Sequence, residues 1–186
     1  MVLTLGVGVS ATAFAQAQTL FANFMKDPRA AQARFVQTDS TGTSSGRVVL
    51  GGMGKLRWEQ TAPFESLTVS NGRVAWQVDM EMAQATKMNA ADSEGWASVF
   101  TNPKALAKSY AVAQKGHTLI LIPKSKETFP GTVEFNDAGY PTVVQFKTWD
   151  DKIVSIRFSQ WQRLKDTPRG LFDYLPPQGM DVVGVQ

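Results

Sequence analysis

The sequence contains no cysteine and only one histidine among its 186 residues. Without cysteine the chain can form no disulfide, no thiolate nucleophile and no zinc site built on cysteine. The one histidine, His117, follows Lys115-Gly116 at an expected turn and has no nucleophile or metal ligand near it in sequence. The zinc-protease, dinucleotide-binding and phosphate-binding loop motifs are also missing. We therefore expect no enzyme, no cofactor and no metal ion.

Charge of one sign is not concentrated anywhere along the chain. The net charge is +3 and the isoelectric point is about 9.2, so the surface is mildly basic. A nucleic-acid-binding face needs lysines and arginines gathered together with aromatic residues. Here the basic residues are scattered singly along alternating strand patterns, which argues against nucleic acid as a partner.

The first 17 residues form an apolar stretch that ends in small residues. Ala13, Ala15 and Ala17 give the small-x-small spacing of a signal-peptide cleavage site. No basic residue precedes the apolar run, and a sequence that starts inside the signal would explain this. The alternative is a buried N-terminal strand or helix. The stretch is too short and glycine-rich for a dependable transmembrane helix. We expect residues 1–17 to be a signal peptide and residues 18–186 to be one domain.

Period-two alternation of apolar residues dominates the rest of the chain. In GKLRWEQTAPFES, Leu56 and Trp58 alternate with charged residues, as in a half-buried antiparallel strand. Asn71-Gly72 separates two such runs and predicts a tight hairpin. The residues 39–46 predict a turn. Strands are predicted at 33–38, 47–50, 55–59, 65–70, 73–79, 118–123, 132–136, 142–149, 153–163 and 171–175.

Helical spacing occurs in only two places. Leu20, Phe21, Phe24 and Met25 predict a short N-terminal helix before Pro28. A second helical region of one or two short helices is predicted around Trp96, Val99, Phe100, Leu106 and Tyr110. The predicted fold is mainly β with some α, an incomplete antiparallel β-barrel (half-barrel) lidded by short α-helices. The helices would bury their apolar sides on the concave face, over Trp58.

Methionines gather near the middle strands. Met80 and Met82 continue the alternation after Trp76, with Met88 following. Methionine adapts to irregular shapes, which suits a site for flexible chains. The alternative, that these side chains fill gaps in an ordinary core, remains equally open at this point.

The order of these motifs resembles the family of periplasmic outer-membrane lipoprotein carriers, LolA. The resemblance rests on ARFVQT, on GKLRWEQTAPFESLTVSNGRVAW, on MAQATK and on the ending FDYLPPQGMDVVG. It implies a hydrophobic cavity for the acyl chains of lipoproteins on the concave face. Expected cavity residues are Leu56, Trp58, Leu67, Val69, Trp76, Val78, Met80 and Met82, and expected lid residues are Val99, Phe100 and Leu106.

The same resemblance implies where such a protein works and with what. It would be a monomer in the periplasm of a Gram-negative bacterium. Its partners would be acylated lipoproteins, an inner-membrane lipoprotein-releasing ABC transporter and an outer-membrane lipoprotein acceptor.

One position departs from the family pattern. Family carriers have an arginine before the Leu56–Trp58 strand that helps to hold the lid shut, and this chain has Gly52 there. This difference keeps a second cargo class open, namely a free fatty acid, a glycolipid or an aryl polyene lipid. A structural module that holds no ligand is the third possibility.

Overall fold

The described part of the chain forms twelve strands in one continuous sheet. The computed structural model describes residues 30–52, 54–90, 108–126 and 128–184. The predicted signal peptide and N-terminal helix lie outside these residues, as does most of the predicted central helical region. No helix within the described ranges has the length and apolar character needed to cross a membrane.

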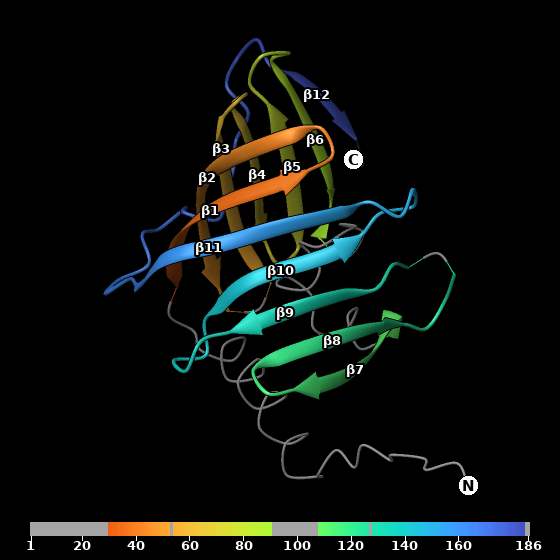
Figure 1. Ribbon diagram of the computed structural model, residues 1–186. Coiled ribbons are helices and arrows are strands. Elements are labelled where there is room, and N and C mark those ends of the chain that lie inside the picture. Colours follow the sequence, from red (N-terminus) through yellow and green to blue (C-terminus); the bar gives the residue numbers. More distant parts are fainter. Residues whose placement is uncertain (1–29, 53, 91–107, 127, 185–186) are drawn as a thin grey trace, which may run out of the picture.

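The chain builds the sheet from two meanders and a final edge strand (Figure 1). The first meander consists of β1 (Ala31–Asp39), β2 (Gly42–Gly51), β3 (Lys55–Ala62), β4 (Ser66–Asn71), β5 (Val74–Asp79) and β6 (Gln84–Asn89). The second consists of β7 (Tyr110–Lys115), β8 (Thr118–Pro123), β9 (Gly131–Phe135), β10 (Pro141–Lys147) and β11 (Ile153–Arg163). The edge strand is β12 (Asp181–Gly184).

Pairing between β1 and β11 joins the two meanders into one sheet. The strand order is β12-β6-β5-β4-β3-β2-β1-β11-β10-β9-β8-β7. Neighbouring strands are antiparallel except β12, which runs parallel to β6. The sheet curls without closing, because β7 and β12 stand at its two ends. The predicted mainly β, open half-barrel is therefore confirmed, and the predicted lid falls outside the described residues.

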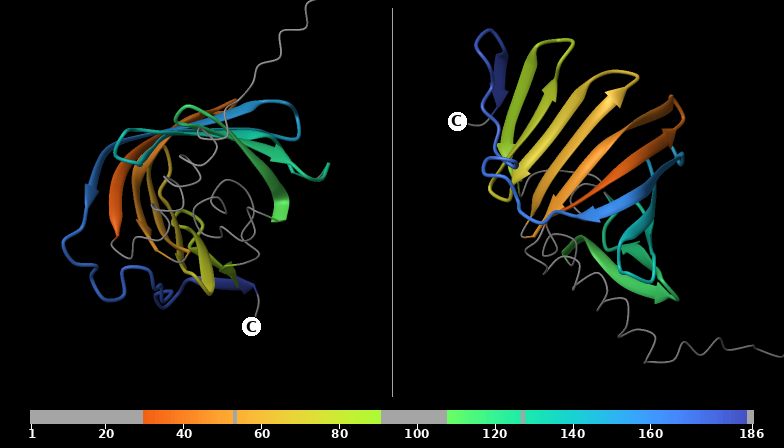
Figure 2. Two further views of the ribbon diagram at one scale, coloured as in Figure 1. Left: turned by 90° about the horizontal axis from the view of Figure 1, so that it is seen from below. Right: turned by 90° about the vertical axis from the view of Figure 1, so that its left-hand side faces the viewer.

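The pairing register between neighbouring strands shows which strand side chains share a face of the sheet. Residues directly opposite one another in an antiparallel pair point to the same face. Val48 opposes Trp58, and Ala33 opposes Val48, so these three share a face. Phe172 of the segment 164–180 packs with Val49, which points to the opposite face from Val48. Figure 2 shows this segment along the outside of the curved sheet, so Ala33, Val48 and Trp58 lie on the concave side, which we call the inner face.

The segment 164–180 covers the outer face of the first meander. Phe172 packs with Ala30 and Val49, and Tyr174 and Met180 pack against the cluster on β4, β5 and β6. Arg57 Nη1 donates a hydrogen bond to the carbonyl oxygen of Leu171 at 3.3 Å. Asn71 Nδ2 donates another to Asp173 Oδ1 at 3.1 Å. The predicted strand at 171–175 is therefore wrong: this stretch contributes its aromatic side chains as a cover instead of pairing.

Three strands were missing from the sequence prediction. β6 has a weakly apolar sequence, QATKMN, and is specified by its pairing with β5 and by Ala85 packing on Val78. β7 begins at Tyr110, where the sequence predicts a helix, and pairs with β8 along its length. β12 pairs with β6 at the edge of the sheet. The predicted turn at 39–46 is also too long, since β2 already starts at Gly42.

Candidate functional site

The inner face carries one large apolar cluster, which we call the inner cluster. It draws on both meanders, so it bridges the β1–β11 junction. Its buried members are Ala33, Phe35, Val48, Leu50, Leu56, Trp58, Leu119, Leu121, Val133, Phe135, Val144, Val154, Ile156 and Phe158. Tyr110, Val112, Phe146 and Trp161 are partly buried against it. The inner face is therefore apolar across both meanders.

Aromatic rings lie at the centre of the inner cluster. Phe35 and Trp58 stack with ring centroids 3.6 Å apart, and Trp58 meets Phe158 edge to face at 6.2 Å. Gly46 is the residue of β2 opposite Phe35. Gly46 has no side chain, so β2 contributes none beside the Phe35 ring at this position. The inner cluster is therefore built around rings that three strands bring together.

Leu56 and Trp58 lie on the inner face, as the sequence predicted. They oppose Leu50 and Val48 of β2 and are both buried, at 1% and 6% exposure. Both belong to the inner cluster. Their expected contact with an acyl chain stays a prediction.

Four of the expected cavity residues lie on the other face. Leu67 opposes Glu59 and Val69 opposes Arg57, so the side chains of Leu67 and Val69 point away from Trp58. Val78 and Trp76 oppose these two on β5 and share their outward direction. The expectation that Leu67, Val69, Trp76 and Val78 share the face of Trp58 is therefore wrong. Alternation within each strand was identified correctly, but it cannot fix the phase between strands; that depends on turn length.

These four residues form an outer cluster instead. Leu67, Val69, Val78 and Ala85 are buried, and Trp76, Tyr174 and Met180 pack against them. Trp76 and Tyr174 meet at 5.8 Å between ring centroids. The outer cluster therefore holds the segment 164–180 on the sheet.

Met80 and Met82 also differ from expectation. Both lie in the turn between β5 and β6 and are 43% and 69% exposed. The strand ends at Asp79, whose Oδ1 accepts hydrogen bonds from the backbone N–H groups of Glu81 and Met82. The turn carries both methionines beyond the sheet, away from the inner cluster. The expected lid residues Val99, Phe100 and Leu106 lie outside the described residues.

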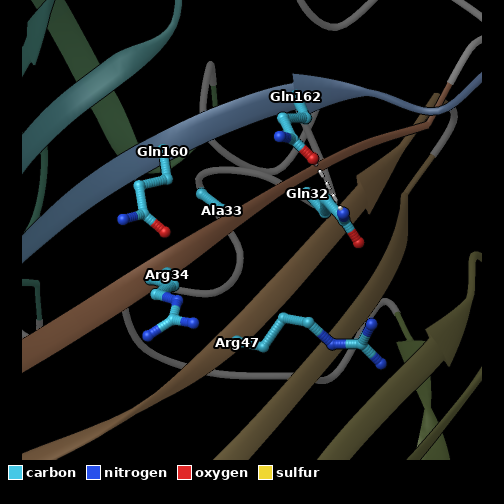
Figure 3. Close-up of a pocket in the computed structure, with 6 residues that line it drawn as sticks. All are labelled: Gln32, Ala33, Arg34, Arg47, Gln160 and Gln162. Atoms are coloured by element: carbon cyan, nitrogen blue, oxygen red, sulfur yellow. Dashed lines mark hydrogen bonds between the residues drawn. The ribbon is translucent and has the colours of Figure 1, made fainter.

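A polar pocket of about 250 Å³ lies on the outer face where β1 and β11 meet (Figure 3). Its lining residues are Gln32, Ala33, Arg34, Arg47, Gln160 and Gln162. Gln160 has a left-handed backbone with φ of 56°, at an irregularity in the pairing of β1 and β11. The polar lining and the position outside the half-barrel make this pocket unsuitable for acyl chains.

Glu59 organises the charges on the outer face of β2 and β3. Arg57 Nε and Arg47 Nε donate hydrogen bonds to its two carboxylate oxygens at 2.6 Å and 2.9 Å. Partial burial raises the pKa of Glu59, but the hydrogen bonds and charges of Arg57 and Arg47 outweigh it, so its pKa is lowered overall. Since Arg57 also binds Leu171, this ion-pair group links the sheet to the segment 164–180.

Two features of the described residues bear on catalysis, a serine motif and the histidine. Gly42-Thr-Ser-Ser-Gly46 matches the G-x-S-x-G motif of serine hydrolases, a match that sequence reasoning overlooked. It lies within the strand β2 and not at a strand-to-helix turn, so Ser44 lacks the setting that the motif requires. His117 is half exposed and lies 3.4 Å from Asp137. Within the described ranges no group of acidic residues and histidine is placed to hold a metal ion.

Sequence comparison decides the family. The family "Outer membrane lipoprotein carrier protein LolA" matches residues 27–175. The chain belongs to the LolA family. An outer-membrane lipoprotein carrier protein of Xanthomonas oryzae pv. oryzae is 30% identical over 192 aligned residues, covering 94% of this chain and 91% of the relative. One of Neisseria meningitidis is 28% identical over 190 aligned residues, covering 93% and 89%.

Solved structures share the fold at much lower sequence identity. An uncharacterised conserved protein of Thermus thermophilus has a TM-score of 0.59 at 15% identity, covering 91% of this chain and 99% of that one. MucB in its complex with MucA from Pseudomonas aeruginosa has a TM-score of 0.52 at 15% identity, covering 88% of this LolA-family chain and 61% of MucB. These likenesses establish the half-barrel architecture alone.

Proposed function

We propose that this protein is a periplasmic carrier that shields the acyl chains of lipoproteins against the inner face of the half-barrel. The observation that carries the proposal is the inner cluster itself, an apolar surface centred on Trp58 in a sheet that does not close. Membership of the LolA family supports the carrier role, since its relatives are named as lipoprotein carriers.

The physical requirement for such a carrier is to hide hydrocarbon from water while keeping it releasable. Burying one methylene is worth about 0.8 kcal/mol, so an uncovered acyl chain would not stay dispersed in the periplasm. An open sheet with an apolar inner face can cover the chain, and movement of a lid can expose it again. The protein would load at an inner-membrane lipoprotein-releasing ABC transporter and unload at an outer-membrane lipoprotein acceptor.

Gly52 supports a second cargo class. It is buried in the turn between β2 and β3, where the family resemblance places a lid-holding arginine. Glycine offers no side-chain donor there, so any lid would be held by other contacts. A relative that carries a free fatty acid, a glycolipid or an aryl polyene lipid is the alternative.

The decisive experiment mixes the purified protein with spheroplasts of its own host and blots the supernatant for released lipoproteins. Release is expected, and it would show that Gly52 is compatible with loading. Absence of release, together with another lipid found by mass spectrometry on protein from native periplasm, would favour the alternative cargo. Absence of both would contradict the carrier role.

Introducing a charged residue on the inner face tests whether the acyl chain binds there. Trp58→Glu or Leu56→Glu should abolish lipid binding, because a carboxylate would face the acyl chain. Val36→Glu is the matched control, since Val36 opposes Arg157 on the outer face and is already 44% exposed. If the glutamate variants fail to fold, Trp58→Leu is used instead. It keeps the position apolar and measures how much the Trp58 ring contributes to lipid binding. Unchanged binding in a folded Trp58→Glu or Leu56→Glu variant would place the cargo elsewhere.

A further inference from the structure

The inner face is apolar over most of its width but changes character on β4, β5 and β6. Trp58 of β3 opposes Thr68 of β4, Thr68 opposes Gln77 of β5, and Gln77 opposes Thr86 of β6. These pairings place Thr68, Gln77 and Thr86 in one row across the inner face, beginning beside Trp58. We call this row the polar row. Most apolar residues of the same strands point outward into the outer cluster, whereas Ala75 and Met88 lie beside the row on the inner face.

The polar row makes no side-chain hydrogen bonds within the described part of the chain. Thr68 and Thr86 are partly buried and Gln77 is exposed. Ser70, also on the inner face, differs: its Oγ donates to the Gly54 carbonyl oxygen and accepts from the Gly72 N–H, both at 3.1 Å. The hydroxyl of Ser70 is therefore used by the two neighbouring turns. The hydroxyls of Thr68 and Thr86 and the amide of Gln77 are available to a ligand.

Charge on this part of the inner face indicates which ligand group would fit. By alternation the inner residues of β4–β6 include no lysine or arginine, and Lys87 lies outward over Trp76. The one carboxylate, Asp79, is engaged by the turn that follows it. A carboxylate or phosphate would find no counter-charge there, whereas hydroxyl and amide side chains can bond neutral carbonyl and hydroxyl groups.

We infer that the polar row is a hydrogen-bonding subsite for the neutral ester, amide and hydroxyl groups that adjoin an acyl chain, as in an acylglycerol. The acyl chain lies on the inner cluster from Trp58 towards the β1–β11 junction, and the polar end of the ligand lies over β4–β6. This fixes the direction of the ligand and disfavours a free fatty acid anion. The inference rests on the proposed function and goes further, because it names the part of the ligand that each region takes.

The test measures three ligands against two matched double variants of the full chain. The ligands are 1-monopalmitoylglycerol, palmitate at pH 8, and hexadecane presented on cyclodextrin, each displacing a fluorescent hydrophobic dye. The inner variant is Thr68→Val with Thr86→Val. The control is Thr38→Val with Thr132→Val, which makes the same changes on the outer face, opposite Ser155 and Gln145 respectively. Circular dichroism melting checks that both variants fold.

We expect the wild type to bind monopalmitoylglycerol more tightly than palmitate. The inner variant should lose roughly tenfold in affinity for monopalmitoylglycerol, the range expected for one or two neutral hydrogen bonds, and keep its affinity for hexadecane. The outer variant should match the wild type for all three ligands. Equal affinity of the wild type and the inner variant for monopalmitoylglycerol would overturn the subsite while leaving the carrier role intact. If none of the ligands displaces the dye from the wild type, the subsite is overturned, and the spheroplast assay decides the carrier role separately.

If the inner variant is unstable, Gln77→Leu supplies the second test, because Gln77 is exposed and its loss opens no cavity. A smaller but selective loss for monopalmitoylglycerol is expected, about threefold. An equal loss for hexadecane would show a general change of the inner face and overturn the subsite.

Discussion

Phe35 and Trp58 stack at 3.6 Å between ring centroids, with 24° between the ring planes, although β2 lies between their strands. The residue of β2 opposite Phe35 is Gly46, so β2 contributes no side chain at that position beside the two rings. Through Phe158, which meets Trp58 edge to face, the same ring group reaches across the junction between the two meanders. The rings thereby tie together the strands on which the proposed acyl-binding surface is built.

The Phe35–Trp58 contact can be measured by a double-mutant cycle. Phe35→Ala and Trp58→Ala should each lower the free energy of unfolding by about 3–5 kcal/mol, since both side chains are buried. The double variant should be less destabilised than the sum, by about 0.5–1.5 kcal/mol, because the stack is lost only once. Urea denaturation gives all four values. Phe35→Ala combined with Phe172→Ala, on opposite faces, is the additive control; equal additivity in both cycles would contradict the stacking interaction.

Replacement of Gly46 should be severely destabilising. A Cβ atom at this position would lie 1.9 Å from the carbonyl oxygen of Glu59, so β2 and β3 would have to separate. The register between these strands also shifts at Ser45–Gly46, which leaves little freedom to adjust. Gly46→Ala is expected to lower the melting temperature by about 4–8 °C or more, as a loss of about 2 kcal/mol or more would do in a domain of this size. Ser45→Ala, at the neighbouring residue, is the control, and a melting temperature close to that of the wild type for Gly46→Ala would contradict the crowding.

Leu56 and Leu67 offer a comparison between the two faces. Both are buried, and truncation of either to alanine should cost about 2–5 kcal/mol of unfolding free energy. Only Leu56 belongs to the inner cluster, so only Leu56→Ala should also weaken acyl-chain binding, measured by dye displacement. Leu67→Ala should instead make the segment 164–180 easier to cleave by protease. A loss of binding in a folded Leu67→Ala variant, with Leu56→Ala unaffected, would reverse the assignment of the faces.

Local sequence patterns predicted the strands well where the apolar alternation was strong. The strands predicted at 118–123 and 153–163 coincide with β8 and β11, and Asn71-Gly72 does form the hairpin turn, with Gly72 at a φ of 89°. β6 was missed because its residues give little apolar signal alone; its partner β5 specifies it. The open half-barrel followed from strand order and alternation together.

The candidate site was only partly predictable, for a geometric reason. Leu56 and Trp58 were assigned to the inner face, but Leu67 and Val69 were grouped with them although they point outward. An apolar strand face indicates burial, and on β4–β6 the burial comes from the segment 164–180 on the outside. No pattern within β4 distinguishes burial by a lid from burial by the chain's own C-terminal segment. The polar row was likewise invisible before the register was known.

The ion pairs of Glu59 predict how stability varies with pH. The pKa of Glu59 in the folded protein is lowered from 4.5, because hydrogen bonds from Arg57 and Arg47 outweigh the effect of burial. A lowered pKa means that the charged carboxylate stabilises the fold fully above the unfolded-state pKa, and that this contribution is lost as the pH falls through the folded-state pKa. Glu59→Gln should therefore melt below the wild type at pH 7, and the difference should shrink as the pH falls below about 4.5. Thermal melts from pH 7 to pH 3 measure the difference, with Glu65→Gln as a control for carboxylate loss near the end of the sheet. A difference that stays constant across this range would mean that the charge of Glu59 contributes nothing, and that only the shape of the side chain matters between Arg47 and Arg57.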